Sequence, residues 1–213
     1  MSRGSIIFLL VAVLLSGILA GCGGTPEGTA DWHYSRGSSY LDEGRYHEAI
    51  AEFSEAVKLD SNLVGAYVNR SLAYNNTGQF EQAIADCSKA IELAPYLVEA
   101  YANRSLAYNN TGQFERAIAD CTKAIELAPN LEGVYVNRSM AYVNTGQFER
   151  AIADCTKAIE LAPNLEGAYI NRALAYIFLY MDAQAKTDIE RAVRLGVDRM
   201  QLEKAMEQAK QKR

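Results

Sequence analysis

The sequence has little of what enzymes, metalloproteins and nucleic-acid-binding proteins use. It has two histidines, His33 and His47, and its acids and bases are interleaved to a formal net charge of −5 over 213 residues. Two histidines leave little for metal binding or acid–base chemistry. Nucleic-acid binding needs a cluster of basic residues, and the sequence has no basic run, so we expect no nucleic-acid partner. No nucleophile–base pair and no glycine-rich phosphate loop is found. We therefore expect no enzyme, no metal site and no cofactor.

Cysteine is also scarce, and three of the four cysteines recur at a constant spacing, as Cys87, Cys121 and Cys155. Each lies on the apolar stripe of an expected helix. Neighbouring helices pack about 10 Å apart, whereas a disulfide needs Cα atoms within about 7 Å. Zinc is disfavoured because no histidine lies nearby. We expect buried thiols that fill space and no disulfide.

One long hydrophobic run is present, at residues 6–20. Its length of about 15 residues is short of the roughly 20 that span a bilayer, but it suits the core of an export signal. The following letters LAGC, at residues 19–22, resemble the lipobox of bacterial lipoproteins. That resemblance implies a signal peptide over residues 1–21, which is removed, and a diacylglycerol on Cys22. An ordinary secretory signal and an uncut membrane anchor stay open as alternatives.

Residues 22–29 combine this cysteine with a stretch of Gly, Pro and Thr that reads as a flexible tether. Buried acyl chains would anchor it firmly, and the tether would hold the folded part within about 25 Å of the bilayer. We expect an extracytoplasmic protein, lipid-anchored to a bacterial membrane. The membrane would be the outer membrane in a Gram-negative envelope and otherwise the outer face of the cell membrane.

The rest of the chain repeats itself, and NRSLAYNNTGQFE occurs at both residues 69–81 and 103–115. A 34-residue period divides residues 30–199 into five units, 30–63, 64–97, 98–131, 132–165 and 166–199. Within each unit, apolar residues recur at steps of three and four in two stretches, and a glycine-containing turn separates the stretches in four units. Each unit is therefore expected to form a helical hairpin. One hairpin cannot bury its apolar face alone, so the copies should stack.

This period, with its recurring aromatic, glycine, alanine and proline positions, resembles the tetratricopeptide repeat family. The resemblance implies an all-α fold, a right-handed α-solenoid of about five helix-turn-helix units. Unit five has Tyr180 where the others have glycine, and no closing proline, so we expect a tighter or shifted turn there. Residues 200–213 should form a helix that caps the stack with Leu202, Ala205, Met206 and Ala209. A membrane-surface helix is the alternative.

An arginine and an acid recur sixteen residues apart in every unit. This spacing faces the first helix of a hairpin toward the second and predicts an ion pair within each unit. The predicted pairs are Arg36–Glu52, Arg70–Asp86, Arg104–Asp120, Arg138–Asp154 and Arg172–Asp188. A row of arginines that binds anions is the functional alternative.

Four units carry an asparagine at one position of the first helix, which gives Asn69, Asn103, Asn137 and Asn171. In the tetratricopeptide family this position lies on the concave face, where asparagines commonly grip the backbone of an extended peptide. The resemblance thus implies a peptide-binding groove, although duplication would copy the asparagines whatever their use. Its apolar neighbours would be Val68, Leu72, Ala102, Leu106, Val136, Met140, Ile170 and Leu174. The clamp by which related modules hold acidic tails is absent, because its cationic positions are not basic here.

Together these features predict a membrane-tethered scaffold that works outside the cytoplasm. It would present its groove to another protein or peptide of the cell envelope, and envelope-complex assembly is the role expected of it. A structural lipoprotein that associates with itself is the main alternative, and glycan binding or catalysis is less favoured.

Overall fold

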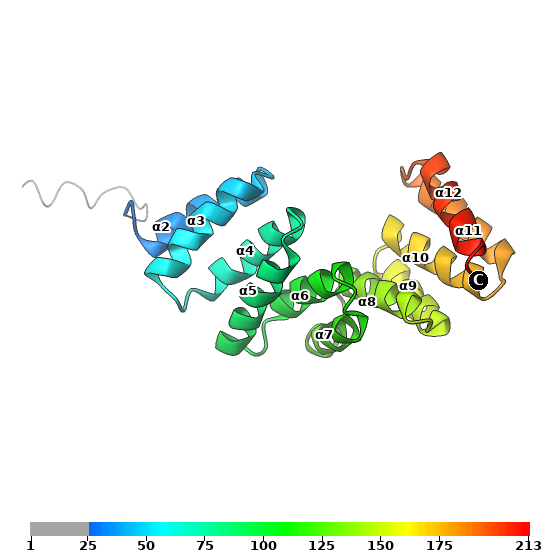
Figure 1. Cartoon of the computed structure of the whole chain (residues 1–213), viewed down its shortest axis with the longest axis horizontal. Helices are drawn as coiled ribbons and strands as arrows, with labels where there is room; N and C mark the ends of the chain where they lie inside the picture. The colour runs from blue at the N-terminus through cyan, green and yellow to red at the C-terminus, as the bar shows by residue number, and fades with distance from the viewer. Residues whose placement is uncertain (1–25) are drawn as a thin grey trace, which may run out of the picture.

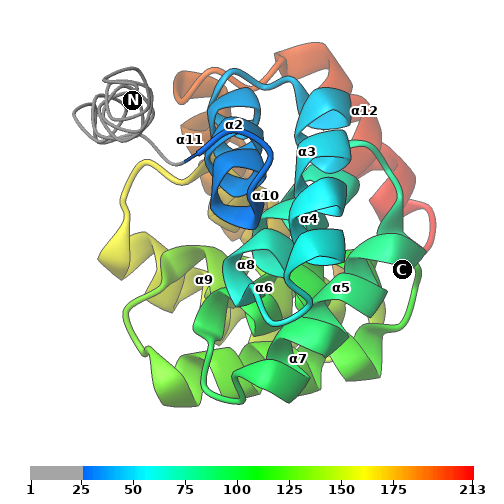
Figure 2. The ribbon, with the colours of Figure 1, turned by 90° about the vertical axis from the view of Figure 1, so that its left-hand side faces the viewer.

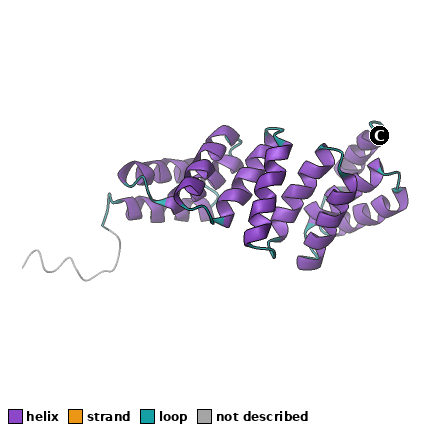
Figure 3. Cartoon of the chain, turned by 90° about the horizontal axis from the view of Figure 1, so that it is seen from below, coloured by secondary structure: helices purple, strands orange, loops and turns teal. Residues whose placement is uncertain are grey.

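The structure is a computed structural model that describes residues 26–213. Over that range it contains eleven helices and no strand, and ten of the helices form five antiparallel hairpins (Figure 1, Figure 3). The expected all-α solenoid is therefore confirmed. The first helices of the hairpins are α2 (Ala30–Asp42), α4 (Val64–Asn76), α6 (Val98–Asn110), α8 (Glu132–Asn144) and α10 (Glu166–Phe178). The second helices are α3 (Tyr46–Leu59), α5 (Phe80–Leu93), α7 (Phe114–Leu127), α9 (Phe148–Leu161) and α11 (Asp182–Arg194).

The predicted signal peptide and the lipidation site Cys22 lie outside the described residues, as do residues 23–25 of the tether. The last four tether residues form a turn that leads into α2. Thr29 Oγ1 donates to the carbonyl of Pro26 at 2.8 Å and accepts from the Trp32 backbone N–H at 3.2 Å. Thr29 is therefore the N-cap of α2. Among the helices of residues 26–213, none has the length and apolarity that crossing a membrane requires.

The way the hairpins touch one another gives the stack an inner and an outer side. Each first helix contacts the first helices of the neighbouring hairpins, whereas within residues 26–213 no second helix contacts another second helix. The second helices α3, α5, α7 and α9 pack on the first helix of the next hairpin instead, and α11 contacts the C-terminal helix. The first helices therefore line the concave side of an arc (Figure 1), and a view from its N-terminal end shows the hairpins winding around (Figure 2).

Small side chains bring the helices close together. Alanines at equivalent places in every unit are fully buried or nearly so, and the central units also bury Cys87, Cys121 and Cys155 completely. All three cysteines are free. Burial raises the pKa of each thiol to about 12, because the thiolate would lose its hydration. These cysteines therefore pack as small neutral groups.

The turn of unit five corrects one expectation. Tyr180 has φ 59°, while the equivalent glycines, Gly44, Gly78, Gly112 and Gly146, have φ between 72° and 74°. The Met181 backbone N–H donates to the Tyr176 carbonyl at 2.8 Å, just as Gln79 donates to Tyr74 at 2.9 Å. The turn thus has the same conformation as the others, and the expected tighter or shifted turn is wrong. The shared hydrogen bond holds tyrosine in a left-handed conformation that glycine would adopt freely.

The C-terminal helix α12 (Arg199–Lys210) covers the end of the last hairpin. Leu202, Met206 and Ala209 are buried against a cluster that includes Ile177 of α10 and Ala185 of α11. Ala205, expected on the same face, is exposed. The last hairpin consequently does not present an open apolar face.

Candidate functional site

Two hollows lie in equivalent places on the concave side, where successive first helices diverge. One has a volume of about 450 Å³ between α4 and α6, and the other has about 340 Å³ between α6 and α8. The first is lined by Val64, Gly65, Val68, Asn69, Ala94, Leu97 and Glu99. The second is lined by Glu99, Ala102, Asn103, Leu106, Leu131, Glu132, Gly133, Val134 and Asn137. We call this pair of hollows, with Glu99 between them, the groove.

The groove contains half of the residues expected in it. The structure brings Val68 and Asn69 together in one hollow, and Ala102, Asn103, Leu106 and Asn137 in the other. The remaining predicted residues, Leu72, Val136, Met140, Ile170, Leu174 and Asn171, line neither hollow. Ile170 and Leu174 pack instead against the C-terminal cluster under α12. The groove is therefore shorter than the asparagine row and is centred on α6.

Three of the four asparagines use their amide N–H groups inside the fold. Asn103 Nδ2 donates to Ser71 Oγ at 3.1 Å and to the Val68 carbonyl at 3.3 Å, both on the preceding first helix. Asn171 makes the same two bonds to the equivalent serine and carbonyl, at 3.0 and 3.2 Å. Asn69 donates to Tyr34 and Ser38 of unit one, at 3.3 and 3.5 Å. These amides tie successive units together, so the asparagines have a structural role whatever they bind.

The amide oxygens of these asparagines accept no hydrogen bond within the described residues. They are Oδ1 of Asn69, Asn103 and Asn171, and none of the three oxygens is buried. The asparagines near the turns follow the same rule, because Asn76 and Asn110 donate to carbonyls of their own helices at 2.8 and 2.9 Å. What the concave side offers a ligand is therefore mostly hydrogen-bond acceptors.

The repeated arginines lie between the two helices of each hairpin. In units two to five the Arg Nε–Asp Oδ2 distance is 2.7 Å, and a second bond joins Nη2 to Oδ1, in the pairs Arg70–Asp86, Arg104–Asp120, Arg138–Asp154 and Arg172–Asp188. The third nitrogen, Nη1, donates to a hydroxyl of the preceding unit, for example Arg104 to Ser88 at 3.0 Å. Hydrogen bonds to Asp120 raise the pKa of the Arg104 guanidinium against the opposing effect of burial. Arginines held in this way are not available to bind anions.

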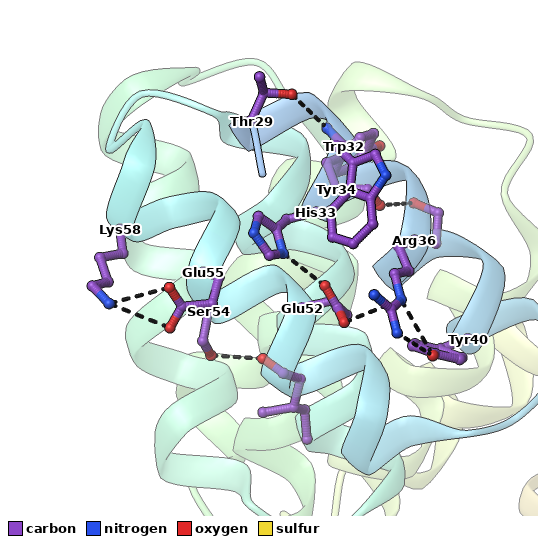
Figure 4. Close-up of polar contacts among 12 residues, drawn as sticks. Thr29, Trp32, His33, Tyr34, Arg36, Tyr40, Glu52, Ser54, Glu55 and Lys58 are labelled. Atoms are coloured by element: carbon purple, nitrogen blue, oxygen red, sulfur yellow. Dashed lines mark hydrogen bonds and ion pairs between the residues drawn. The ribbon is translucent and has the colours of Figure 1, made fainter. Parts of the chain in front are cut away.

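The ion pair of unit one is different (Figure 4). Arg36 Nε lies 3.3 Å from Glu52 Oε1, and its side chain is 46% exposed, compared with 14–18% for the arginines of the other units. Glu52 also lies 2.7 Å from His33 Nδ1, and Arg36 donates to the Tyr40 hydroxyl. Within residues 26–213, Arg36 lacks the bond to a hydroxyl of a preceding unit that the other four arginines make, and it is correspondingly more exposed.

Several groove residues were missed by sequence analysis. Glu99, Gly65 and Gly133 occupy the second position of their helices, one turn before the asparagine, and so share its face. This spacing could have identified them. Leu97 and Leu131 come from the loops before α6 and α8, outside the helical stripes, but they occupy the same position of the 34-residue period, which could also have identified them. Among residues 26–213, no cluster of His, Cys, Asp and Glu could hold a metal ion.

Family models recognise the repeats in the sequence. A tetratricopeptide repeat model matches residues 98–131, a second matches residues 64–96 and 133–165, and a TPR repeat model matches residues 37–78. Together the matches extend over more than half of the chain. No curated protein sequence matches it.

Solved structures share the fold at low sequence identity. A crystal structure of MamA is 23% identical, with a TM-score of 0.68 over 80% of this chain and 93% of MamA. YrrB, described as a TPR protein with an unusual peptide-binding site, is 18% identical, with a TM-score of 0.67 over 91% of this chain and 97% of YrrB. TTC0263, a thermophilic TPR protein of Thermus thermophilus, is 18% identical, with a TM-score of 0.67 over 85% of this chain and 98% of its own. On its repeat matches and its fold, the chain belongs to the tetratricopeptide repeat family.

Proposed function

We propose that this protein is a membrane-tethered scaffold outside the cytoplasm, which binds an extended segment of another envelope protein in its groove. The observation that carries this proposal is the pair of hollows at equivalent places of successive units. Equivalent hollows repeat along the arc at the spacing of the first helices, roughly 10 Å. A segment in the extended polyproline II conformation advances about 3.1 Å per residue with three residues per turn, so every third side chain would face the surface and meet a hollow. A peptide is therefore the ligand whose own repeat fits this surface.

The lining of the hollows supports a peptide rather than a small polar ligand. Leu106, Leu131 and Val68 supply apolar surface, and Leu131 is 40% exposed although it is a large hydrophobic residue. Beside them, the asparagine oxygens accept hydrogen bonds, which backbone N–H groups of an extended segment can donate. Apolar contact would thus provide affinity and the oxygens would orient the segment.

The membrane tether remains a proposal that rests on residues 6–22. The described fold begins at Pro26, four residues after Cys22, so a lipidated Cys22 would lie at most about 14 Å from the first turn. A partner bound in the groove would then be concentrated beside the membrane, as assembly of an envelope complex requires. In metabolic labelling with a radioactive fatty acid, we expect label in the native chain and none in Cys22→Ser. Label that persists in Cys22→Ser would contradict lipidation at this residue.

Gly133 offers a direct test of the groove. It lies on α8 and lines one hollow, and a Cβ built on it meets no atom within 4 Å. Gly133→Trp should therefore fill the hollow without disturbing the fold. Gly133→Ala is the matched control, since it also favours the helix but leaves the hollow open. Substituting the asparagines would be less informative, because Asn103 and Asn171 join the units.

The assay is chemical crosslinking in cells followed by purification of the tagged chain. We expect the native chain and Gly133→Ala to capture the same specific proteins, and Gly133→Trp to lose them at an unchanged helical content. If Gly133→Trp keeps every partner, the groove is not the binding surface.

Self-association by end-to-end stacking is the weaker proposal, because both ends of the stack are covered. At the C-terminal end α12 packs on the last hairpin. At the N-terminal end Trp32 occupies the position that the fully buried Ala66 has in unit two, and Arg36 lies over its ring at 5.0 Å from the centroid. We expect a constant monomer mass by light scattering of the delipidated chain at increasing concentration. A mass that increases with concentration would favour self-association.

A further inference from the structure

We propose that the segment bound in the groove is cationic, with lysine or arginine side chains among apolar ones. This inference rests on the proposed function and adds the chemistry of the partner. It follows from three properties of the concave side: its hydrogen-bonding groups, its charges, and the position of Glu99.

Most hydrogen-bonding groups that the concave side leaves free are acceptors; Asn137, whose side chain makes no hydrogen bond within the described residues, keeps both its donor and its acceptor. Asn69, Asn103 and Asn171 spend their N–H donors on the preceding unit and keep free oxygens. Asn75 and Asn109, which line neither hollow, donate to backbone carbonyls of the next first helix, at 2.9 and 2.8 Å. Their own oxygens are buried and have no hydrogen-bond partner within the described residues. Buried acceptors without donors are unusual, and they make the local potential negative. A ligand on this surface is therefore favoured if it brings donors.

The charged side chains that the first helices of units two to five leave unpaired within the described residues are negative. No lysine occurs in any of the five first helices, and the arginines of units two to five are bonded to aspartates of the second helices. Glu99, Glu132 and Glu166 lie in the first turns of α6, α8 and α10, and none forms an ion pair within residues 26–213. Lysines and further arginines lie on the second helices and in the C-terminal part. In units two to five, the basic residues outside these pairs are thus confined to the outer side, which leaves the concave side of these units negative.

First-turn acids also complement a helix dipole, so their charge alone would not identify a ligand. The free amide oxygens are an independent observation, because they favour donors for a reason unrelated to helix stability. Both observations point to the same ligand chemistry. Lysine and arginine side chains are donors without acceptors and carry the complementary charge.

Glu99 fixes where the cation would lie. Glu99 lines both hollows, between the apolar surface of Val68 and Leu97 on one side and that of Ala102 and Leu106 on the other. A bound segment could place a cationic side chain against Glu99 and one apolar side chain in each of the two flanking hollows. Glu132 lines the second hollow and would hold a further cation.

Selection from a random library of 12-residue peptides tests this inference and does not require that the partner be identified first. The full chain is immobilised in detergent, and the enriched peptides are sequenced. We expect enriched peptides with a positive net charge and with Lys or Arg next to apolar residues. A synthetic peptide of that kind should bind about tenfold more weakly to the triple variant Glu99→Gln, Glu132→Gln, Glu166→Gln, and several-fold more weakly when salt is increased tenfold.

The control variant removes three exposed acids from the first turns of the outer helices, Glu81→Gln, Glu115→Gln and Glu149→Gln. It has the same net charge as the groove variant, and we expect unchanged binding. An equal loss of affinity in both triple variants would overturn the inference, because only the total charge would then matter.

Gly133→Trp separates failure of the inference from failure of the proposed function. If enriched peptides are neutral or acidic and Gly133→Trp abolishes their binding, the groove binds peptides and only the cationic inference is overturned. If the peptides bind equally well to Gly133→Trp, or none is enriched over an uncoated surface, both proposals are contradicted.

Discussion

Replacing Arg104 by alanine should destabilise the protein strongly, whereas the same change at Arg36 should not. Arg104 makes two hydrogen bonds to Asp120, at 2.7 and 2.9 Å, and the Asp120 side chain is only 9% exposed. Without the arginine, this carboxylate would stay buried without a counter-charge. Breaking a buried ion pair costs about 3–5 kcal/mol, and the partial exposure of this pair lowers the expected loss to about 2–4 kcal/mol.

Arg36 is the matched control, because it occupies the same position of unit one. Both arginines lie over two aromatic rings, so the loss of those contacts largely cancels in the comparison. Arg36 is 46% exposed, and Glu52 would keep His33 as its hydrogen-bond partner. Exposed ion pairs contribute little to stability.

Denaturation by urea, followed by circular dichroism, measures both changes under the same conditions. We expect the midpoint to fall markedly for Arg104→Ala and to stay close to the native value for Arg36→Ala, with similar slopes. Arg104→Lys should fall between them, because lysine keeps the charge but cannot form the two parallel bonds. Equal midpoints for the two alanine variants would refute the conclusion that burial makes the repeated pairs structural.

Other predictions concern single side chains. The three buried cysteines should not react with a maleimide at pH 8 until the chain unfolds; since the unfolded thiols ionise first, the unfolding free energy should also fall above pH 9, by about 1.4 kcal/mol per pH unit for each thiol. Rapid labelling of the folded chain would contradict this. Tyr180→Gly should increase the free energy of unfolding by up to about 1 kcal/mol, because it relieves a left-handed tyrosine; a clear decrease would show that the turn is not strained. Asn103→Ala should cost about 1 kcal/mol in a urea titration, while Asn137→Ala should cost little, because Asn137 makes no side-chain hydrogen bond within the described residues. Equal losses would contradict the assigned bonds.

The architecture could be predicted from the sequence because the same helical periodicity recurs in every repeat unit, with a turn glycine in four of the five. The first helices begin at residues 30, 64, 98, 132 and 166, where the 34-residue period places the unit boundaries. The sixteen-residue spacing of Arg104 and Asp120 likewise depends only on the geometry of one hairpin. Features of this kind follow from periodicity and turn chemistry within a single unit.

The groove could be predicted only in part, because its shape depends on contacts between units. The bonds of Asn103 reach Ser71 and Val68 in the preceding unit, so the sequence did not reveal that its donors are already used. The second hollow has space beside Gly133, whereas Gly65 is in close contact with Tyr34 of the preceding unit, and both arrangements depend on how the units pack. The turn at Tyr180 was mispredicted because residue preference was weighed without the hydrogen bond from Met181 that holds it.

Site-specific photo-crosslinking in cells tests the groove most directly. A photo-reactive amino acid replaces either Leu106, in the groove, or Lys123, on the outer helix α7 of the same unit. We predict that Leu106 forms an adduct with a discrete envelope protein, that Lys123 does not, and that adding Gly133→Trp removes the adduct while Gly133→Ala preserves it. Adducts that form from Lys123 alone, or that persist in Gly133→Trp, would contradict binding in the groove.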